Sequence, residues 1–229
     1  MMSTFAPADW QKIRLVAFDV DGTLYRQRSL RLRMGRDLAI DAVAKRDRST
    51  IRVVNAYRSI RERLADDEIV DFEPVLIAET AKAASVSPEK VNAIVSEWIE
   101  LRPLRYLRGC LFSGVPELFV GLRRAGKKVG IFSDYPATGK LAAMGLTAHH
   151  IVTANDVGLL KPHAGGLQSL MAAANVATDE TLFIGDRADR DGVAGRRAGV
   201  RTLIKSSKPV ESFQTFHTFY DPLFEAFMH

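Results

Sequence analysis

Cysteine is nearly absent from this chain: its 229 residues include only Cys110, so no disulfide can form within it. Cys110 lies between glycine and leucine with no histidine nearby, and we expect it to be a small buried hydrophobic residue. Long hydrophobic runs are missing too, because no uninterrupted apolar stretch approaches the roughly 18 residues of a membrane-spanning helix. The segment 1–10 also lacks the basic and apolar parts of a secretory signal. We therefore expect a reducing, cytoplasmic location and no membrane partner.

A strong excess of charge of either sign is absent as well. The chain is 47% hydrophobic and 26% charged, which is typical of a soluble globular protein, and it is long enough for one large domain or for a core with an inserted module. The net charge of +5 suits an anionic small molecule as well as it suits nucleic acid. Basic residues gather between positions 26 and 63, whereas 65–79 is acidic. Because the excess is local, we expect a small anionic partner and not nucleic acid.

Short apolar runs that end in turn residues predict buried β-strands. Five such runs lie at 15–19, 128–133, 150–154, 181–185 and 201–205. Helical patterns before and between the last four of them cover 116–125, 138–144 and 164–175. Parallel strands need crossover connections of about a dozen residues or more, and this spacing provides them. The alternation therefore predicts an α/β fold with a doubly wound parallel sheet, on which we expect the aromatic tail, 210–229, to pack.

The segment 25–108 interrupts this alternation and has no convincing β run. Its helical patterns cover 31–45, 50–65, 72–84 and 88–100. Ser87 before Pro88 is a typical helix start, with the serine as N-cap and the proline at the first helical position. We predict that 25–108 is an inserted helical cap domain, and that residues 1–24 and 109–229 together form the α/β core domain. A cap at this place can close over the end of the first strand as a lid.

Two aspartates follow the first predicted strand. Asp19 and Asp21 come directly after a short, continuous apolar run, and Gly22 then permits the chain to turn. In open α/β sheets ligands bind outside the carboxyl ends of the strands, so both carboxylates are candidates for a functional site. The structural alternative for an isolated pair of this kind is an N-cap and turn.

Further polar residues recur where the later strands end. They are Ser133 and Asp134 after the second strand, Lys161 after the third, and Asp186 and Asp191 after the fourth. Each of them alone has an ordinary structural explanation, as a turn residue, an exposed lysine or a helix cap. Their shared position at the ends of strands favours one common site.

These residues resemble a known family. Asp-Val-Asp-Gly-Thr-Leu at 19–24, Ser133, Lys161-Pro162 and Gly-Asp-x-x-x-x-Asp at 185–191 are similar in order and spacing to the four motifs of the haloacid dehalogenase (HAD) superfamily. The resemblance covers the core and implies a Rossmann-like sheet with a helical cap between the first and second motifs. Asp21 resembles the residue that distinguishes phosphatases and phosphomutases from the dehalogenases and phosphonate hydrolases of this superfamily.

The resemblance implies roles for the carboxylates. Asp19 would attack phosphorus and form an aspartyl-phosphate, a step that requires charge neutralisation. Mg²⁺ prefers hard oxygen ligands, which Asp19 and Asp186 would supply as carboxylates and Asp21 as a backbone carbonyl. Asp191 would either support these ligands from behind or bind the metal through water. The side chain of Asp21 would act as general acid on the leaving oxygen and then as general base on the hydrolytic water.

The remaining motif residues would contact the phosphate. Ser133 would donate a hydrogen bond to a phosphoryl oxygen, and Lys161 would offset the anionic charge and hold Asp19 ionised. The family often has an amide after the hydroxyl of the second motif, so Asp134, our further candidate for substrate binding, departs from the pattern and adds negative charge near the phosphate. Asp189 competes with Asp191 for the last carboxylate role.

The arginines of the predicted cap are candidates for substrate contacts, but their spacing argues against most of them. They are Arg26, Arg28, Arg31, Arg33 and Arg36. Side chains two and three residues apart cannot all share one face of a helix, so we expect most of these arginines to be solvated surface charges.

Together the sequence predicts a Mg²⁺-dependent phosphatase that hydrolyses a small phosphorylated metabolite, phosphoglycolate-like or a sugar phosphate, through an aspartyl-phosphate. Two alternatives stay open. One is a phosphomutase of the same family, and the other is a catalytically weak protein that binds nucleic acid or phosphate with the basic cap. The core motifs do not distinguish substrates from one another, and the sequence does not indicate an oligomeric state.

Overall fold

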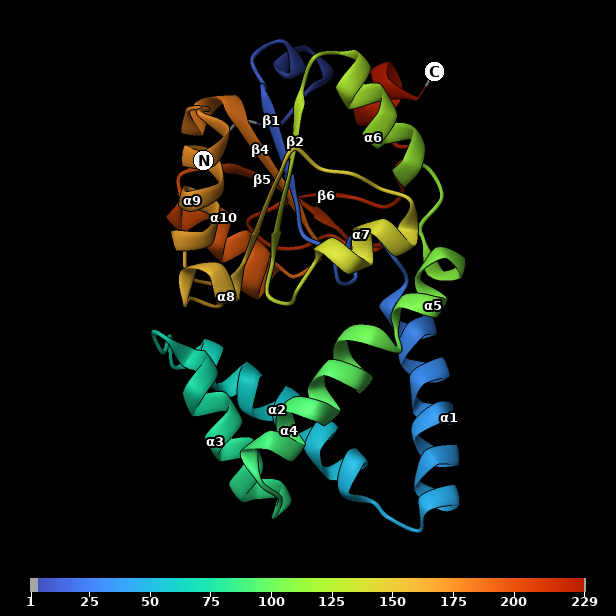
Figure 1. The fold of residues 1–229 in the computed structure, drawn as a ribbon. Coiled ribbons are helices and arrows are strands. Elements are labelled where there is room, and N and C mark those ends of the chain that lie inside the picture. The colour runs from blue at the N-terminus through green and yellow to red at the C-terminus, as the bar shows by residue number, and fades with distance from the viewer. Residues whose placement is uncertain (1–3, 229) are drawn as a thin grey trace.

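The computed structural model describes residues 4–228 and contains one six-stranded parallel β-sheet, which lies in the upper half of the view in Figure 1. The strands are β1 (Leu15–Phe18), β2 (Lys128–Ser133), β3 (His150–Thr153), β4 (Thr181–Gly185), β5 (Arg201–Lys205) and β6 (Gln214–Phe216). They lie in the order β3-β2-β1-β4-β5-β6, and every neighbouring pair is parallel. The prediction of an α/β fold with a doubly wound parallel sheet is confirmed. The predicted core domain begins at residue 1 and ends at residue 229, but residues 1–3 and 229 lie outside the described residues.

Helices cover both faces of the sheet (Figure 1). They are α6 (Val115–Arg124), α7 (Thr138–Met144), α8 (Ala154–Val157), α9 (Gly165–Ala174) and α10 (Val193–Arg197), with the short 3₁₀ or π turns η1 (Pro7–Gln11), η3 (Arg108–Cys110), η4 (Thr178–Glu180), η5 (Ala188–Gly192) and η6 (Pro222–Phe227). The buried strand β1 explains the two layers, since successive side chains of a strand point to opposite faces. Leu15 and Ala17 pack into one hydrophobic cluster, and Val16 and Phe18 pack into the other.

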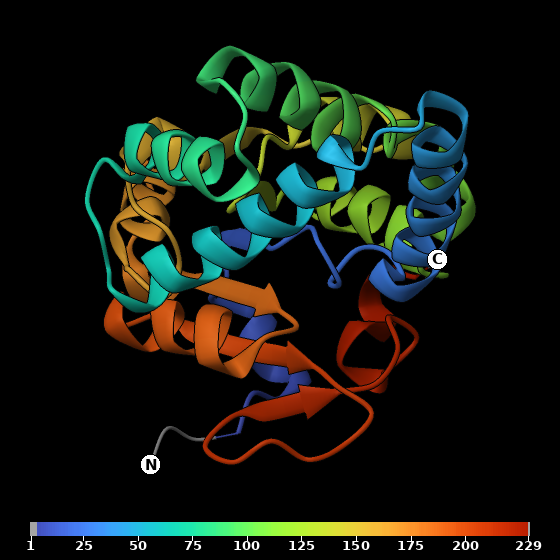
Figure 2. The ribbon, with the colours of Figure 1, turned by 90° about the horizontal axis from the view of Figure 1, so that it is seen from below.

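A helical insertion, defined here as residues 27–107, lies between β1 and β2. It consists of α1 (Gln27–Lys45), α2 (Ser49–Asp66), α3 (Phe72–Ala84), α4 (Pro88–Val95), η2 (Ser96–Leu101) and α5 (Leu104–Leu107). The insertion lies beyond the end of the sheet at which β1 ends, and in the view from below α2 runs obliquely across the middle of the molecule (Figures 1 and 2). Among the helices of residues 4–228, none is both long enough and apolar enough to cross a bilayer.

The predicted start of α4 is confirmed in detail. Ser87 is its N-cap, and the serine hydroxyl accepts a hydrogen bond from the backbone N–H of Lys90 at 3.3 Å, while Pro88 occupies the first helical position. The helical segment predicted at 88–100 is continuous in the structure, but its α-helical part ends at Val95 and it continues as the π-helical turns of η2. The other predicted helices agree with the structure to within a few residues at each end.

The aromatic tail packs on the core as predicted, and it also adds the strand β6, which the sequence analysis did not identify. Four of its phenylalanines are buried, namely Phe216, Phe219, Phe224 and Phe227. The indole N–H of Trp10 donates to the backbone carbonyl of Leu223 at 2.6 Å, which ties the beginning of the chain to its end. The three-residue strand is shorter than the runs on which a strand prediction rests.

Replacing Gly121 in α6 with alanine tests how tightly this tail is packed. The added methyl group would lie 1.9 Å from the carbonyl oxygen of Phe227, so the backbone would have to move. We expect Gly121→Ala to lower the free energy of unfolding by about 1–3 kcal/mol, the usual cost of overpacking, as measured by urea denaturation.

The matched control is Gly35→Ala in α1, where nothing lies within 4 Å of the added methyl group. Alanine is the better helix former there, by up to about 1 kcal/mol, so this variant should be as stable as the parent or slightly more stable. Equal stability of Gly121→Ala and Gly35→Ala would contradict the close approach of the tail to α6.

Candidate active site

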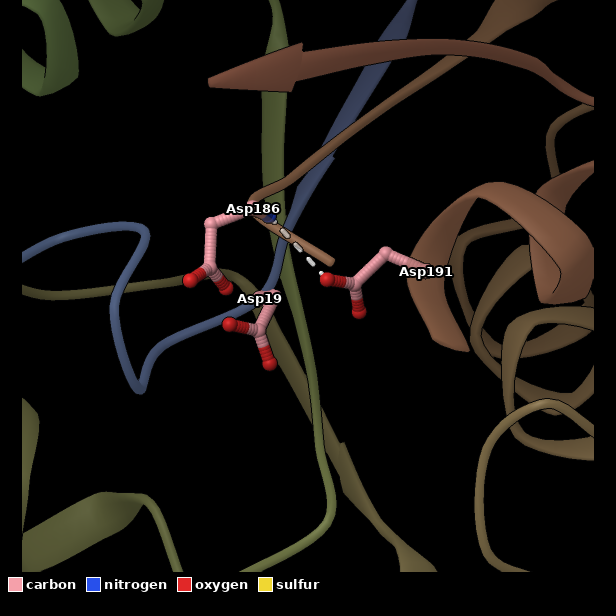
Figure 3. Close-up of side chains that lie close together, drawn as sticks. All are labelled: Asp19, Asp186 and Asp191. Carbon is pink, nitrogen blue, oxygen red and sulfur yellow. Dashed lines mark hydrogen bonds between the residues drawn. The ribbon is translucent and has the colours of Figure 1, made fainter. Parts of the chain in front are cut away.

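Three carboxylates meet at the carboxyl ends of the two central strands. Asp19 directly follows β1 and Asp186 directly follows β4, and the two strands are paired so that the backbone N–H of Asp19 donates to the carbonyl of Ile184 at 2.9 Å. Asp191 enters the same place from η5. One carboxylate oxygen of each of these aspartates lies within 4.8 Å of the others (Figure 3). The structure therefore gathers an acidic cluster, Asp19, Asp186 and Asp191, of the kind that can hold a metal ion.

The turn after Asp19 is shaped to bring these carboxylates together. Gly22 has a φ of +104°, and a Cβ atom at this position would lie 2.2 Å from a carboxylate oxygen of Asp186, so glycine is required both by conformation and by space. The hydroxyl of Thr23 lies 3.0 Å from Asp19 Oδ2 and 3.3 Å from Asp186 Oδ1. The Asp-Gly-Thr sequence thus supplies the turn and a hydrogen-bond bridge between the two strand ends.

Lys161 neutralises part of the acidic cluster. Its Nζ lies 2.5 Å from Asp19 Oδ1 and 2.8 Å from Asp191 Oδ1, and the residue is only 2% exposed. The same Nζ lies 5.0 Å from the ring centroid of Phe132 and 5.8 Å from that of Phe183. A lysine in such a place is costly to bury unless it is paired, so its position is set by the two carboxylates.

The pKa values of the cluster reflect burial and mutual repulsion. Burial, together with the neighbouring carboxylates, raises the pKa of Asp19 well above its usual range in spite of Lys161. Burial and the charge of Asp191 raise the pKa of Asp186 to about 7. Burial alone would lower the pKa of Lys161, but Asp19 and Asp191 raise it well above its usual value. One lysine therefore leaves the cluster with a surplus of negative charge.

Asp191 is fixed more firmly than the other two carboxylates. Its Oδ2 accepts the backbone N–H groups of Asp186 at 3.1 Å and Arg187 at 3.0 Å, while Oδ1 accepts from Lys161. Asp189, the competing residue in the sequence analysis, is instead exposed and forms an ion pair with Arg187 at 2.8 Å. Of these two aspartates, Asp191 is the one that the structure brings into the cluster.

Asp21 has a separate environment that the sequence analysis did not anticipate. Both of its oxygens accept from Nζ of Lys140, at 2.7 and 2.6 Å, and the hydroxyl of Tyr25 donates to the same carboxylate. Burial would raise the pKa of Asp21, but Lys140 and Tyr25 outweigh it and hold this pKa below its usual value. No spacing rule links a lysine in α7 to Asp21, so Lys140 becomes visible only in the folded chain.

Ser133 and Asp134 lie at the end of β2, next to Lys161. Ser133 is fully buried, and its hydroxyl oxygen accepts the backbone N–H of Tyr135 at 3.3 Å. The carboxylate of Asp134 accepts the backbone N–H of Lys161 at 3.0 Å, so it holds the loop that carries the lysine. Asp134 and Tyr135 line the cavity described next, and Ser133 is not among its lining residues.

A cavity of about 730 Å³ lies between the helical insertion and the sheet, and the acidic cluster forms part of its wall. Two buried arginines join its two sides. Arg61 of α2 donates to Tyr57 and to the backbone carbonyl of Asp134, and its guanidinium lies 4.4 Å from the ring centroid of Tyr135. From the other side Arg190 in η5 forms ion pairs with Glu62 and Asp66 of α2. These contacts hold α2 against the carboxyl end of the sheet.

This fold and site define an α/β enzyme with an acidic centre at the carboxyl edge of a parallel sheet. The family model of haloacid dehalogenase-like hydrolases matches residues 13–199, and the chain belongs to this family. The family assignment confirms the resemblance that the motifs indicated and identifies the protein as a hydrolase.

Individual proteins are similar to this chain over most of its length. A glyceraldehyde 3-phosphate phosphatase of Methanopyrus kandleri is 25% identical over 199 residues, which cover 83% of each chain. The structure of the magnesium-bound HAD-hydrolase YfnB from Bacillus subtilis matches with a TM-score of 0.65 at 16% identity, over 90% of this chain and 95% of that one. A β-phosphoglucomutase from Clostridium difficile matches with a TM-score of 0.64 at 18% identity, over 93% and 94%. At these identities the two structures show that the fold is shared.

The raised pKa of Asp186 predicts how stability depends on pH without a metal. Because the folded protein holds this proton up to about pH 7 and the unfolded chain loses it near 3.8, the free energy of unfolding should fall as pH rises between these values. In Asp186→Asn this decrease in the free energy of unfolding should be smaller by about a few kcal/mol than in the parent. The measurement is denaturation in the presence of a chelator at several pH values.

The control for this measurement is Asp189→Asn, which removes a carboxylate three positions away that lies outside the cluster. It should retain the fall in stability, and Asp19 should contribute to that fall in every variant. If Asp186→Asn and the parent showed parallel pH profiles, the surplus of negative charge assigned to Asp186 would be wrong.

Proposed function

We propose that the protein is a Mg²⁺-dependent phosphatase that hydrolyses a small phosphomonoester, phosphoglycolate-like or a sugar phosphate, through an aspartyl-phosphate. The observation that carries the proposal is the buried carboxylate of Asp19, which is paired with Lys161 and lies beside Asp186 and Asp191 in the wall of the cavity. Membership of the haloacid dehalogenase-like hydrolases and the similarity to a protein named as a phosphatase support it.

The acidic cluster fits a magnesium ion by the chemistry of its donors. It offers hard carboxylate oxygens, and the raised pKa of Asp186 indicates negative charge that a cation would relieve. Asp19 and Asp186 would hold the ion with the backbone carbonyl of Asp21, and Asp191 through water. Bound Mg²⁺ would neutralise charge between the carboxylates and the phosphoryl group.

The two aspartates of the first motif would divide the covalent work. A carboxylate oxygen of Asp19 forms a bond to phosphorus while the bond from phosphorus to the leaving oxygen breaks, and Asp21 gives its proton to that oxygen. Asp21 then takes a proton from a water molecule that attacks the phosphorus of the aspartyl-phosphate. Inorganic phosphate leaves, and the carboxylate of Asp19 is regenerated.

Other residues would hold these groups and the phosphate in place. Lys161 offsets the charge that builds up between Asp19 and the phosphoryl oxygens, and Ser133 donates a hydrogen bond to one of those oxygens. Lys140 and Tyr25 hold the pKa of Asp21 below its usual value in the free enzyme, and Asp21 would take the proton that it donates from solvent when the substrate binds. Asp134 contributes by fixing the Lys161 loop.

We further propose that residues 25–108 act as a cap domain and that residues 1–24 and 109–229 act as the catalytic core. The helical character of the insertion and the two arginine contacts of α2 support this division. In such an arrangement the core supplies the chemistry and the cap excludes water and selects the leaving group.

Removal of the nucleophile tests the proposed function. Asp19→Asn should lower phosphate release from a broad panel of phosphomonoesters by about a thousandfold or more, because an amide cannot form the acyl phosphate. Chelation of Mg²⁺ should abolish release in the parent and readdition should restore it. The readout is inorganic phosphate, and the matched control is Asp189→Asn, whose carboxylate lies outside the cluster.

The outcomes separate this proposal from the two alternatives. Near-normal activity of Asp19→Asn would contradict covalent catalysis by that residue. A phosphomutase would convert a monophosphate without steady release of phosphate. A nucleic-acid-binding protein would release none and would bind oligonucleotides in a way that weakens steeply as salt is raised.

A further inference from the structure

The cavity is much larger than a phosphoryl group requires. Its volume of about 730 Å³ is in the usual range for sites that enclose a whole small molecule, about 300–1,000 Å³. The helical insertion lines it with polar side chains, which include Gln27 from α1 and Asn55 and Ser59 from α2. The insertion therefore offers polar side chains to a ligand larger than a phosphoryl group.

Among residues 4–228, two of the cations that line this cavity have no carboxylate partner. Four of the lining cations are held by carboxylates, and they are Lys140, Lys161, Arg187 and Arg190. Arg31 and Arg58 also line the cavity, but among residues 4–228 neither has a hydrogen bond or an ion pair with any other side chain. Both come from the insertion, whereas the surplus of negative charge belongs to the sheet side.

Both arginines share the cavity with Asp21. The carboxylate of Asp21 is paired with Lys140, whose Nζ lies 5.1 Å from the ring centroid of Tyr135, and Tyr135 lines the cavity too. Because Asp21 would protonate the leaving oxygen, the leaving group would lie in this cavity, which Arg31 and Arg58 line from the insertion.

We infer that the substrate carries a second anionic group, a carboxylate or a second phosphate, on its leaving group, and that Arg31 and Arg58 bind it. This inference rests on the proposed function, since it places the phosphoryl group at Asp19. A planar guanidinium suits both anions, because each can accept two parallel hydrogen bonds from it. Gln27, Asn55 and Ser59 would contact hydroxyl groups between the two anions. Of the five arginines that the sequence analysis considered between positions 26 and 36, Arg31 is the one that lines the cavity.

Three phosphate esters that differ at one carbon test the inference. They are 3-phosphoglycerate, glyceraldehyde 3-phosphate and glycerol 3-phosphate, which carry a carboxylate, an aldehyde and an alcohol at the end remote from the phosphate. We expect the ratio of kcat/KM for 3-phosphoglycerate over glycerol 3-phosphate to be well above one, and to fall about tenfold in Arg31→Gln and about tenfold in Arg58→Gln. Fructose 1,6-bisphosphate against fructose 6-phosphate gives the same comparison for a second phosphate.

Arg28→Gln is the matched control, because Arg28 lies in α1 but does not line the cavity, and it should leave both ratios unchanged. A larger ratio for the carboxylate pair than for the phosphate pair would assign the second group as a carboxylate, and the reverse would assign it as a phosphate. Equal kcat/KM values within both pairs, or ratios that Arg31→Gln and Arg58→Gln do not change, would overturn the inference and leave the proposed function intact. Absence of phosphate release from every compound would instead overturn the proposed function.

Discussion

The ion pairs of Lys161 with Asp19 and Asp191 are the interaction on which the rest of the site depends. A buried ammonium group is stable only where carboxylates surround it, and these two carboxylates come from β1 and from the turn after β4. Lys161 itself is held by Asp134 at the end of β2. One buried lysine, through its ammonium group and its backbone N–H, thus joins three strand ends, and the sheet order that places β1 between β2 and β4 is what makes this possible.

The charge of the site is divided between its two sides. Lys161 compensates only part of the acidic cluster, and burial together with the charge of Asp191 raises the pKa of Asp186 to about 7. Arg31 and Arg58 of the helical insertion line the same cavity, and neither has a carboxylate partner among residues 4–228. A small anionic substrate that contacts a metal ion at the acidic cluster and the guanidinium groups of the insertion would compensate the charges on both sides of the cavity. In this account the sheet determines the reaction, and the insertion determines which ester reacts.

The sequence predicted those parts of the molecule that follow from local pattern and from sheet geometry. The positions of Asp19 and Asp186 were predictable because carboxyl ends of neighbouring parallel strands meet at one edge. The pair of Lys140 with Asp21 was not, because it joins a helix to a turn 119 residues away and no spacing rule connects them. The same holds for Arg61, a buried cation whose surroundings come from both sides of the cavity. The strand Gln214–Phe216 was not predicted, because three residues are too few to show an alternating hydrophobic pattern.

The central claim is that Asp19 carries the phosphoryl group during turnover, and a trapped intermediate tests it most directly. The Asp21→Asn variant, in which hydrolysis of the intermediate should be slow, would be mixed with p-nitrophenyl phosphate and Mg²⁺, quenched in acid and mapped by peptide mass spectrometry. The account predicts one phosphoryl group per chain, on Asp19. A phosphoryl group on any other residue, or p-nitrophenol release with no phosphorylated protein at any quench time, would contradict it.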